Sequence, residues 1–149
     1  LATAMVNGDS INLGAGNDKL VLGDFVNTGL VSNAETVIGG IDTDTITIGT
    51  QVSNGSVDLG DGEDKLVLGN FTNSATLSNV ESVVGGTGID TLQLATALSV
   101  TSNINLGAGN DKLTLGDFVN AGTLSNIETI IGGSDADTIA LGSALTTSA

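Results

Sequence analysis

The chain has 149 residues, enough for one domain, and its 17 acidic and 3 basic side chains give a formal net charge of −14. It contains no His and no Cys, which excludes the usual zinc and haem ligands and the catalytic sets built on either residue, so we expect no enzymatic activity. The excess of acidic residues argues against a nucleic-acid partner, and no apolar run approaches the ~18 residues that a membrane-spanning helix needs, so we expect no membrane insertion.

Three copies of one unit make up the chain. The run that begins at Ile11 recurs at Val57 and at Ile104, so the period is 46 or 47 residues. The copies span residues 1–47, 48–93 and 94–140, and residues 141–149 open a fourth copy. This self-similarity predicts a single solenoid domain that is a slice of a longer tandem array.

Each copy is expected to hold four short strands. In the first copy the runs rich in Leu and β-branched residues are 10–13, 19–22, 34–38 and 45–48, and each is too short for a helix. Gly/Asp loops at 14–18 and 39–44 alternate with longer polar connectors at 23–33 and 49–55. Period-two alternation predicts that Leu20 and Leu22 point inward, while Lys19 and Val21 point outward.

This order of strands, loops and connectors predicts an all-β parallel β-solenoid of about six two-stranded rungs, two per repeat. A single wide rung per repeat is disfavoured because it would stack Glu35, Glu81 and Glu128 at about 4.8 Å. Two rungs per repeat would put all Gly/Asp loops along one edge. Equivalent residues would then form columns: Lys19, Lys65 and Lys112; Phe25, Phe71 and Phe118; Asn33, Asn79 and Asn126.

The Gly/Asp loops carry the chemistry that we expect of this chain. Six of them end in an aspartate followed by a short apolar strand, at Asp18, Asp44, Asp64, Asp90, Asp111 and Asp137. Ca²⁺ takes six to eight oxygen ligands in flexible geometry, and glycine allows the backbone to turn several carbonyls toward one point. Two stacked loops would offer two carboxylates and about four carbonyls, so a single file of six loops would hold about five ions. The alternative is that Gly and Asp only make turns.

The loops also resemble a known calcium-binding repeat. Residues 85–93, Gly-Gly-Thr-Gly-Ile-Asp-Thr-Leu-Gln, resemble the Gly-Gly-x-Gly-x-Asp-x-apolar-x nonapeptide of RTX (repeats-in-toxin) proteins, a β-roll repeat. The lead-in Ser-Asn-x-Glu-x-x-x-Gly-Gly at 125–133 is similar to that of RTX-type bacterial surface-layer and adhesin proteins. Departures from the nonapeptide are Leu13, Leu59 and Leu106 at its first Gly, and Asp42 and Asp135 at a later Gly.

From the loop chemistry and the resemblance together we expect Ca²⁺ as the cofactor. The candidate metal-binding residues are the six loop aspartates Asp18, Asp44, Asp64, Asp90, Asp111 and Asp137, the further aspartates Asp42 and Asp135, and the glycines Gly14, Gly16, Gly39, Gly60, Gly62, Gly85, Gly88, Gly107, Gly109 and Gly132.

The resemblance implies a secreted, extracellular or cell-surface protein that is exported by type I secretion. We expect a structural module of a surface layer, adhesin or extracellular filament that folds on Ca²⁺ and self-associates end to end or laterally. The alternatives are a carbohydrate- or ice-binding module, with a cell-surface polysaccharide as partner, and the RTX tail of a secreted enzyme. Ice binding would need a regular outward grid of Thr or Asn, which Ala15 and Glu63 interrupt.

Overall fold

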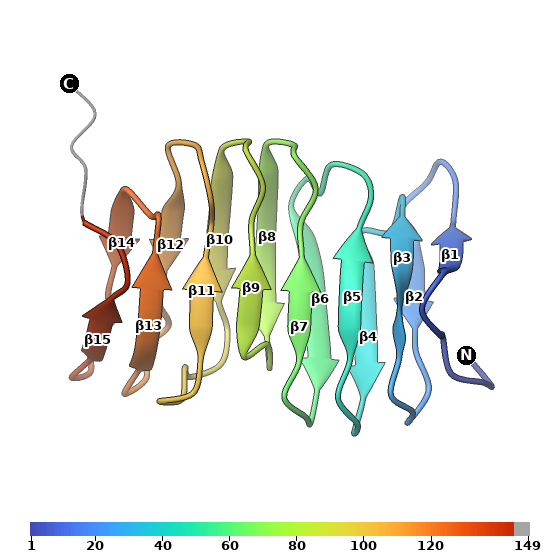
Figure 1. The fold of residues 1–149 in the computed structure, drawn as a ribbon, viewed down its shortest axis with the longest axis horizontal. Coiled ribbons are helices and arrows are strands. Elements are labelled where there is room, and N and C mark those ends of the chain that lie inside the picture. Colours follow the sequence, from blue (N-terminus) through green and yellow to red (C-terminus); the bar gives the residue numbers. More distant parts are fainter. Residues whose placement is uncertain (145–149) are drawn as a thin grey trace.

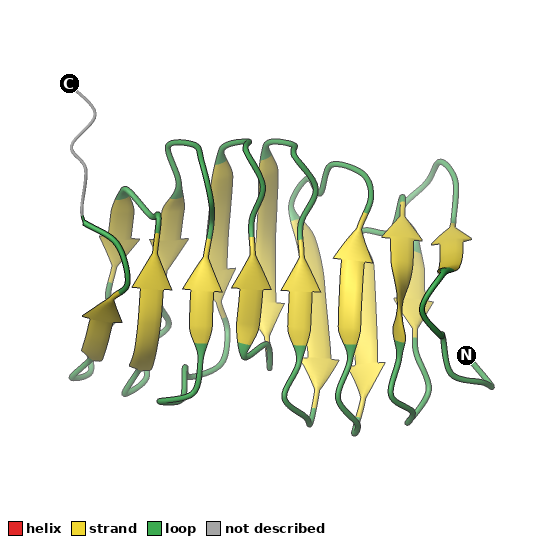
Figure 2. Ribbon diagram, in the orientation of Figure 1, coloured by secondary structure: helices red, strands yellow, loops and turns green. Residues whose placement is uncertain are grey.

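The chain winds into a β-solenoid made of two parallel β-sheets (Figure 1). The computed structural model describes residues 1–144. Within these residues the odd-numbered strands form the eight-stranded sheet A and the even-numbered strands the seven-stranded sheet B. The chain therefore changes sheet after every strand and completes about seven turns over this range. Figure 2 shows strands joined only by loops, and residues 1–144 hold no helix long and apolar enough to cross a membrane.

All strands are short, and several contain only three residues. Of the predicted overhang 141–149, Leu141 ends the last strand, and residues 145–149 lie outside the described part of the chain. The strands are β1 (Asp9–Asn12), β2 (Lys19–Val21), β3 (Thr28–Ser32), β4 (Thr36–Gly40), β5 (Thr45–Ile48), β6 (Gly55–Gly60), β7 (Lys65–Val67), β8 (Asn73–Ser78), β9 (Ser82–Val84), β10 (Asp90–Leu94), β11 (Asn103–Asn105), β12 (Lys112–Thr114), β13 (Ala121–Ser125), β14 (Thr129–Ile131) and β15 (Thr138–Leu141).

The predicted all-β parallel solenoid is confirmed, and so is the inward direction of its leucines. Leu20 and Leu22 are 5% and 4% exposed, whereas Val21 is 46% exposed. Inward side chains stack in register along each sheet, because parallel pairing places equivalent positions of successive turns side by side. One such fully buried row on sheet A is Ile46, Leu66, Val83, Ile104 and Leu124. The burial of these aliphatic rows between the sheets supplies the main driving force for the fold.

Each repeat contributes five strands rather than the expected four. The additional strand of the first copy is β3, which lies inside the segment predicted to be a polar connector. The apolar pattern of β3 is incomplete, because Val31 points inward but the other inward position is Gly29. A Cβ on Gly29 would collide with the Met5 side chain, so a neighbouring turn fills the space that a side chain at Gly29 would otherwise fill.

The fifth strand shortens the turns and changes their number. Residues paired on neighbouring strands of one sheet are 17 residues apart for Thr28 and Thr45, and 20 for Thr45 and Lys65. The expected rung had about 23 residues. Five strands per repeat make two and a half turns, so the prediction of six rungs, two per repeat, is wrong in number, and about seven turns form instead.

A half-integer number of turns places equivalent residues of successive repeats on opposite sheets. Lys19 on β2 and Lys112 on β12 belong to sheet B, whereas Lys65 on β7 belongs to sheet A. The predicted single lysine column is therefore wrong. The same alternation separates the middle copy from the other two in the predicted Phe and Asn columns, because Phe71 follows β7 and Asn79 follows β8.

Candidate metal centres

The Gly/Asp loops lie along both edges of the solenoid, not along one. We call edge 1 the side on which the chain passes from sheet A to sheet B, at the top of Figure 1, and edge 2 the side on which it returns. The strand order places three loops on each edge. Edge 1 holds Gly14, Gly16 and Asp18; Gly85, Gly88 and Asp90; Gly107, Gly109 and Asp111. Edge 2 holds Gly39, Asp42 and Asp44; Gly60, Gly62 and Asp64; Gly132, Asp135 and Asp137.

Two pairs of loops are direct neighbours. On edge 2 loop 39–44 stacks on loop 60–64, with Gly40 paired to Gly60 and the Asp61 amide donating to the Gly40 carbonyl at 3.1 Å. On edge 1 loop 85–90 stacks on loop 107–111, and the Ala108 amide donates to the Gly86 carbonyl at 3.0 Å. Loops 14–18 and 132–137 have no Gly/Asp loop next to them among the described turns. We call the two pairs the edge 2 site and the edge 1 site.

A ladder of hydrogen-bonded polar side chains, buried except for its last member, runs through the edge 2 site. The backbone amide and the side-chain amide of Asn27 both donate to Asp44 Oδ1 at 2.9 Å. The Asp44 amide donates to Asp64 Oδ1 at 2.7 Å, and the Asp64 amide donates to Glu81 Oε2 at 2.8 Å. Each carboxylate thus accepts from the backbone of the preceding turn, which fixes the register of four successive turns.

The edge 1 site repeats this ladder with the same residue types. The Asn73 side chain donates to Asp90 Oδ1 at 2.8 Å. The Asp90 amide donates to Asp111 Oδ1 at 2.7 Å, and the Asp111 amide donates to Glu128 Oε2 at 2.7 Å. The order Asn, Asp, Asp, Glu therefore forms one structural unit that appears once on each edge, because two and a half turns separate one copy from the next.

Sequence reasoning missed the two ends of this ladder. The asparagines and glutamates lie 17 residues from the aspartate that they contact, as in Asn27 to Asp44 and Asp64 to Glu81. The same separation recurs in Asn73 to Asp90 and in Asp111 to Glu128. This constant spacing was the available signal, and it equals the length of the short turn.

The second carboxylate oxygen of the ladder aspartates has no partner. Oδ2 of Asp44, Asp64, Asp90 and Asp111 is buried and makes no hydrogen bond, and Asp18 Oδ2 shares this state. The four residues of the two sites are at most 1% exposed. Leaving a buried polar group without a partner costs about 1–3 kcal/mol, and more for a charged group. Four such atoms, two in each pair of stacked loops, call for a cation or a proton.

Burial also raises the pKa of these carboxyls. Desolvation raises the pKa of Asp44 and Asp90. The hydrogen bonds from Asn27 and Asn73 oppose this shift, and so does the nearby backbone of Gly40 and Gly86. Desolvation, with repulsion from Asp44, Glu81 and Glu63, raises the pKa of Asp64 to about 7. Desolvation likewise raises the pKa of Asp111, with smaller contributions from Asp90 and Glu128. Ionised carboxylates are therefore costly here unless a positive charge joins them.

The number of carboxylates limits what each site can hold. In the part of the chain that the structure describes, no three acidic side chains converge on one point. Each site offers two buried aspartates from stacked loops, so further ligands would be carbonyl oxygens of the glycine-rich backbone. An oxygen-only set of this kind suits a hard divalent ion such as Ca²⁺ and does not suit a transition metal that prefers nitrogen or sulfur.

Glycine is required where the loops stack. Gly60 has φ +91° and a Cβ there would collide with the Gly40 carbonyl, whereas Gly14, at the equivalent position with φ +89°, has open space around it. We expect Gly60→Ala to destabilise the protein by about 3 kcal/mol, from strain plus collision, and Gly14→Ala by about 1 kcal/mol, from strain alone. Urea denaturation of both variants measures the difference. Equal losses would contradict close stacking at Gly60.

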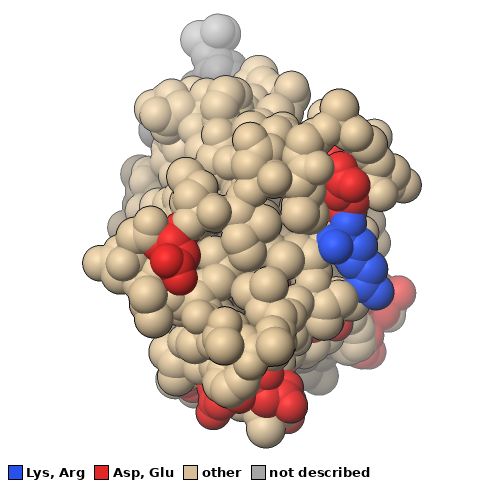
Figure 3. All heavy atoms as spheres, turned by 90° about the vertical axis from the view of Figure 1, so that its right-hand side faces the viewer, with Lys and Arg blue, Asp and Glu red and all other residues tan. Residues whose placement is uncertain are grey.

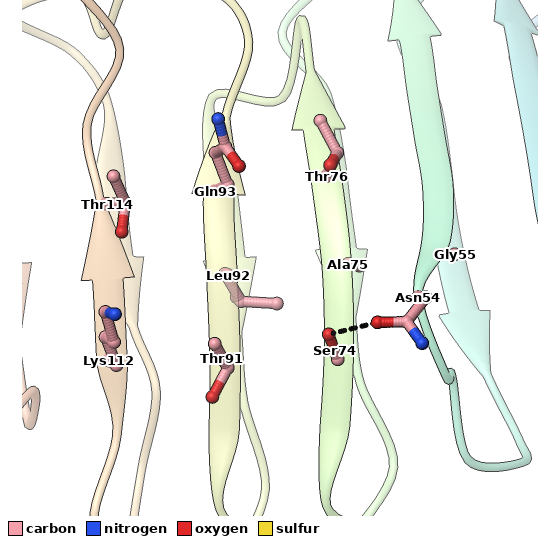
Figure 4. Close-up of a pocket in the computed structure, with 10 residues that line it drawn as sticks. All are labelled: Asn54, Gly55, Ser74, Ala75, Thr76, Thr91, Leu92, Gln93, Lys112 and Thr114. Atoms are coloured by element: carbon pink, nitrogen blue, oxygen red, sulfur yellow. Dashed lines mark hydrogen bonds between the residues drawn. The ribbon is translucent and has the colours of Figure 1, made fainter.

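A shallow groove lies on the outer face of sheet B and begins at Thr91 and Lys112, which directly follow the aspartates of the edge 1 site (Figure 4). Register places Ser74, Thr91 and Lys112 in one outward row. A second row contains Thr76, Gln93 and Thr114. The rows mix hydroxyl, amide and ammonium groups, so this part of sheet B differs from the regular Thr or Asn grid that ice binding would need.

No family model, curated protein or solved structure matches this chain. A solenoid of stacked repeats is consistent with a structural repeat module.

Proposed function

We propose that the protein is a structural repeat module whose stacked turns are held together by Ca²⁺ at two sites. The unpartnered Oδ2 atoms of Asp44 with Asp64, and of Asp90 with Asp111, carry this proposal. Each pair belongs to two loops that are in direct backbone contact, so a single ion between the loops would contact both carboxylates and the carbonyls around them. When bound, the ion supplies positive charge where two buried carboxylates would otherwise repel each other.

Calcium fits this arrangement better than magnesium. Mg²⁺ demands near-ideal octahedral geometry and gives up its water reluctantly, whereas Ca²⁺ accepts irregular sets of six to eight oxygens. A loop backbone fixed by the solenoid offers an irregular set. The number of sites in the proposal is two rather than about five, because the six loops are divided between two edges and only two pairs are neighbours.

The cellular context belongs to the same proposal. Extracellular calcium modules bind at 10⁻⁴–10⁻³ M, a concentration range reached outside cells and not in the cytosol. A solenoid stabilised by calcium would be more stable outside the cell than in the cytosol, and this supports a secreted or surface-layer role. An uncharged outward row on sheet A, Leu30, Thr47, Val67 and Val84, supports lateral packing against a second copy of the solenoid.

Isosteric substitution of one ladder aspartate tests the proposal. Asp90→Asn keeps an oxygen for the Asn73 hydrogen bond and replaces the unpartnered oxygen by an uncharged amide. We expect calorimetric titration with CaCl₂ to give two ions for the natural protein and one for this variant. In EDTA at pH 8 the same variant should melt at a higher temperature than the natural protein, since it removes a buried charge.

The control is Asp58→Asn, which removes one negative charge outside the loops. Asp58 accepts a hydrogen bond from the Asn79 side chain, and Asn12 and Asn105 fill the equivalent place opposite Asn33 and Asn126. This variant should still bind two ions. The proposal would be contradicted if the natural protein gave no heat of calcium binding, or if Asp90→Asn bound the same number of ions as the natural protein.

A further inference from the structure

We propose that the two calcium sites differ in affinity, that the edge 2 site fills first, and that exposed acidic residues around its loops set this order. The inference rests on the proposed function and goes beyond it, because the buried ligand sets of the two sites are alike. Both sites have two buried aspartates, a preceding asparagine and a following glutamate. A difference in affinity must therefore come from residues outside the ladder.

Register aligns the two sites residue by residue. In the edge 2 site Asp61 and Glu63 belong to the loop Gly-Asp-Gly-Glu-Asp at 60–64. The corresponding loop of the edge 1 site, at 107–111, reads Gly-Ala-Gly-Asn-Asp, so Ala108 and Asn110 stand in their places. In the stacked partner loop, Asp42 of edge 2 corresponds to Gly88 of edge 1.

The turn before each site shows the same contrast. A Cβ placed on Gly40 would lie 3.0 Å from Asp24 Oδ1, so Asp24 borders the edge 2 site. At the equivalent Gly86 the neighbour is Asn70, whose Oδ1 would lie 2.6 Å from the added Cβ. Four acidic residues around the edge 2 site, Asp24, Asp42, Asp61 and Glu63, thus correspond to four uncharged residues around the edge 1 site.

The basic residues do not cancel this difference in negative charge between the two sites. Lys65 follows Asp64 and Lys112 follows Asp111, so each site has one lysine at the same place. Acidic side chains gather at the bottom of the end-on view, which is the side of edge 2 (Figure 3). Asp42, Asp61 and Glu63 are exposed, so they attract a divalent ion through solvent and their effect is screened by salt.

Single-site proteins separate the two affinities. Asp111→Asn leaves only the edge 2 site, and Asp64→Asn leaves only the edge 1 site. We expect calorimetric titration with CaCl₂ to give about tenfold tighter binding at the edge 2 site in low salt, and only about threefold near 0.15 M NaCl, from four exposed charges. The Kd of each single-site protein at both salt concentrations is the readout.

Exchanging the exposed residues tests their role. D61A/E63N gives the loop at 60–64 the sequence of the loop at 107–111, and A108D/N110E gives the loop at 107–111 the sequence of the loop at 60–64. Each variant loop therefore has a sequence that already occurs in this fold. In the single-site backgrounds the first exchange should weaken calcium binding and the second should strengthen it. Circular dichroism with excess calcium checks that both variants keep the β-solenoid.

The outcomes separate this inference from the proposed function. If neither single-site protein binds calcium, both the calcium module and the order of filling are refuted. If both bind with equal Kd, or if the exchanges leave each Kd unchanged, the order of filling is refuted while the calcium module stands. Tighter binding at the edge 2 site that is lost by D61A/E63N supports the inference.

Discussion

Removing calcium at pH 8 is expected to lower the melting temperature by about 15 °C. A ligand present at about 100 times its Kd stabilises the folded state by about 2.7 kcal/mol per site, so two sites contribute about 5 kcal/mol. For a chain of this size 1 kcal/mol shifts the melting temperature by about 3 °C. The physical source is the neutralisation of two carboxylates in each pair of stacked loops, whose Oδ2 atoms have no hydrogen-bond partner.

Thermal melts followed by far-ultraviolet circular dichroism, in CaCl₂ and in EDTA, measure this shift. MgCl₂ at the same concentration should restore little of it, because magnesium does not accept the irregular oxygen set. The double variant D64N/D111N removes one carboxylate from each site and should melt at the same temperature in both buffers. A natural protein that melts alike with and without calcium would remove the basis of the proposed function.

The metal-free protein is expected to become less stable as the pH rises from about 4 to about 8. Burial raises the pKa of Asp64 from 3.8 to about 7 in the folded state, and it also raises the pKa of Asp44, Asp90 and Asp111. The folded state therefore holds these protons more tightly than the unfolded state does. Their stabilising effect is fully present below pH 3.8 and is lost as the pH rises through the folded-state pKa.

The expected loss is large enough to measure directly. A shift of this size at Asp64 alone corresponds to about 4 kcal/mol between the ends of the range. Urea denaturation in EDTA at several pH values gives the dependence of stability on pH, and Asp64→Asn should make this dependence weaker. In calcium the slope should reverse, since the ion binds only ionised carboxylates. A metal-free stability that rises with pH would contradict the buried, unpartnered state of these aspartates.

The sequence determined the fold class because the evidence for it is local. Alternation in short Leu-rich runs, glycines at turns and a period of 46 or 47 residues are enough to predict parallel stacked strands. The inward direction of Leu20 and Leu22 followed from the same alternation, and burial confirms it. The loops that contain the candidate ligands were also visible in the sequence, because a Gly-rich stretch ending in Asp is itself a local feature.

The number of strands per repeat could not be predicted from the sequence, because one strand lacks the full apolar pattern. In β3 the inward positions hold Gly29 and Val31, so half of the apolar signal is absent, and Met5 of a neighbouring turn fills the space. Without this strand the sequence predicted two turns per repeat, whereas the structure has two and a half. Every inference that depended on columns of equivalent residues then failed, from the lysine column to the single edge of loops.

By itself, the sequence determined that this acidic chain forms a solenoid of parallel strands and which short loops bring aspartate and glycine together. Only the tertiary structure decided which loops become neighbours, because that depends on the count of strands per repeat. The partners Asn27, Asn73, Glu81 and Glu128 became visible in the same way. Each of these contacts joins residues that are 17 positions apart in the sequence. The length of one turn of the solenoid sets this separation, and the properties of the individual residues do not.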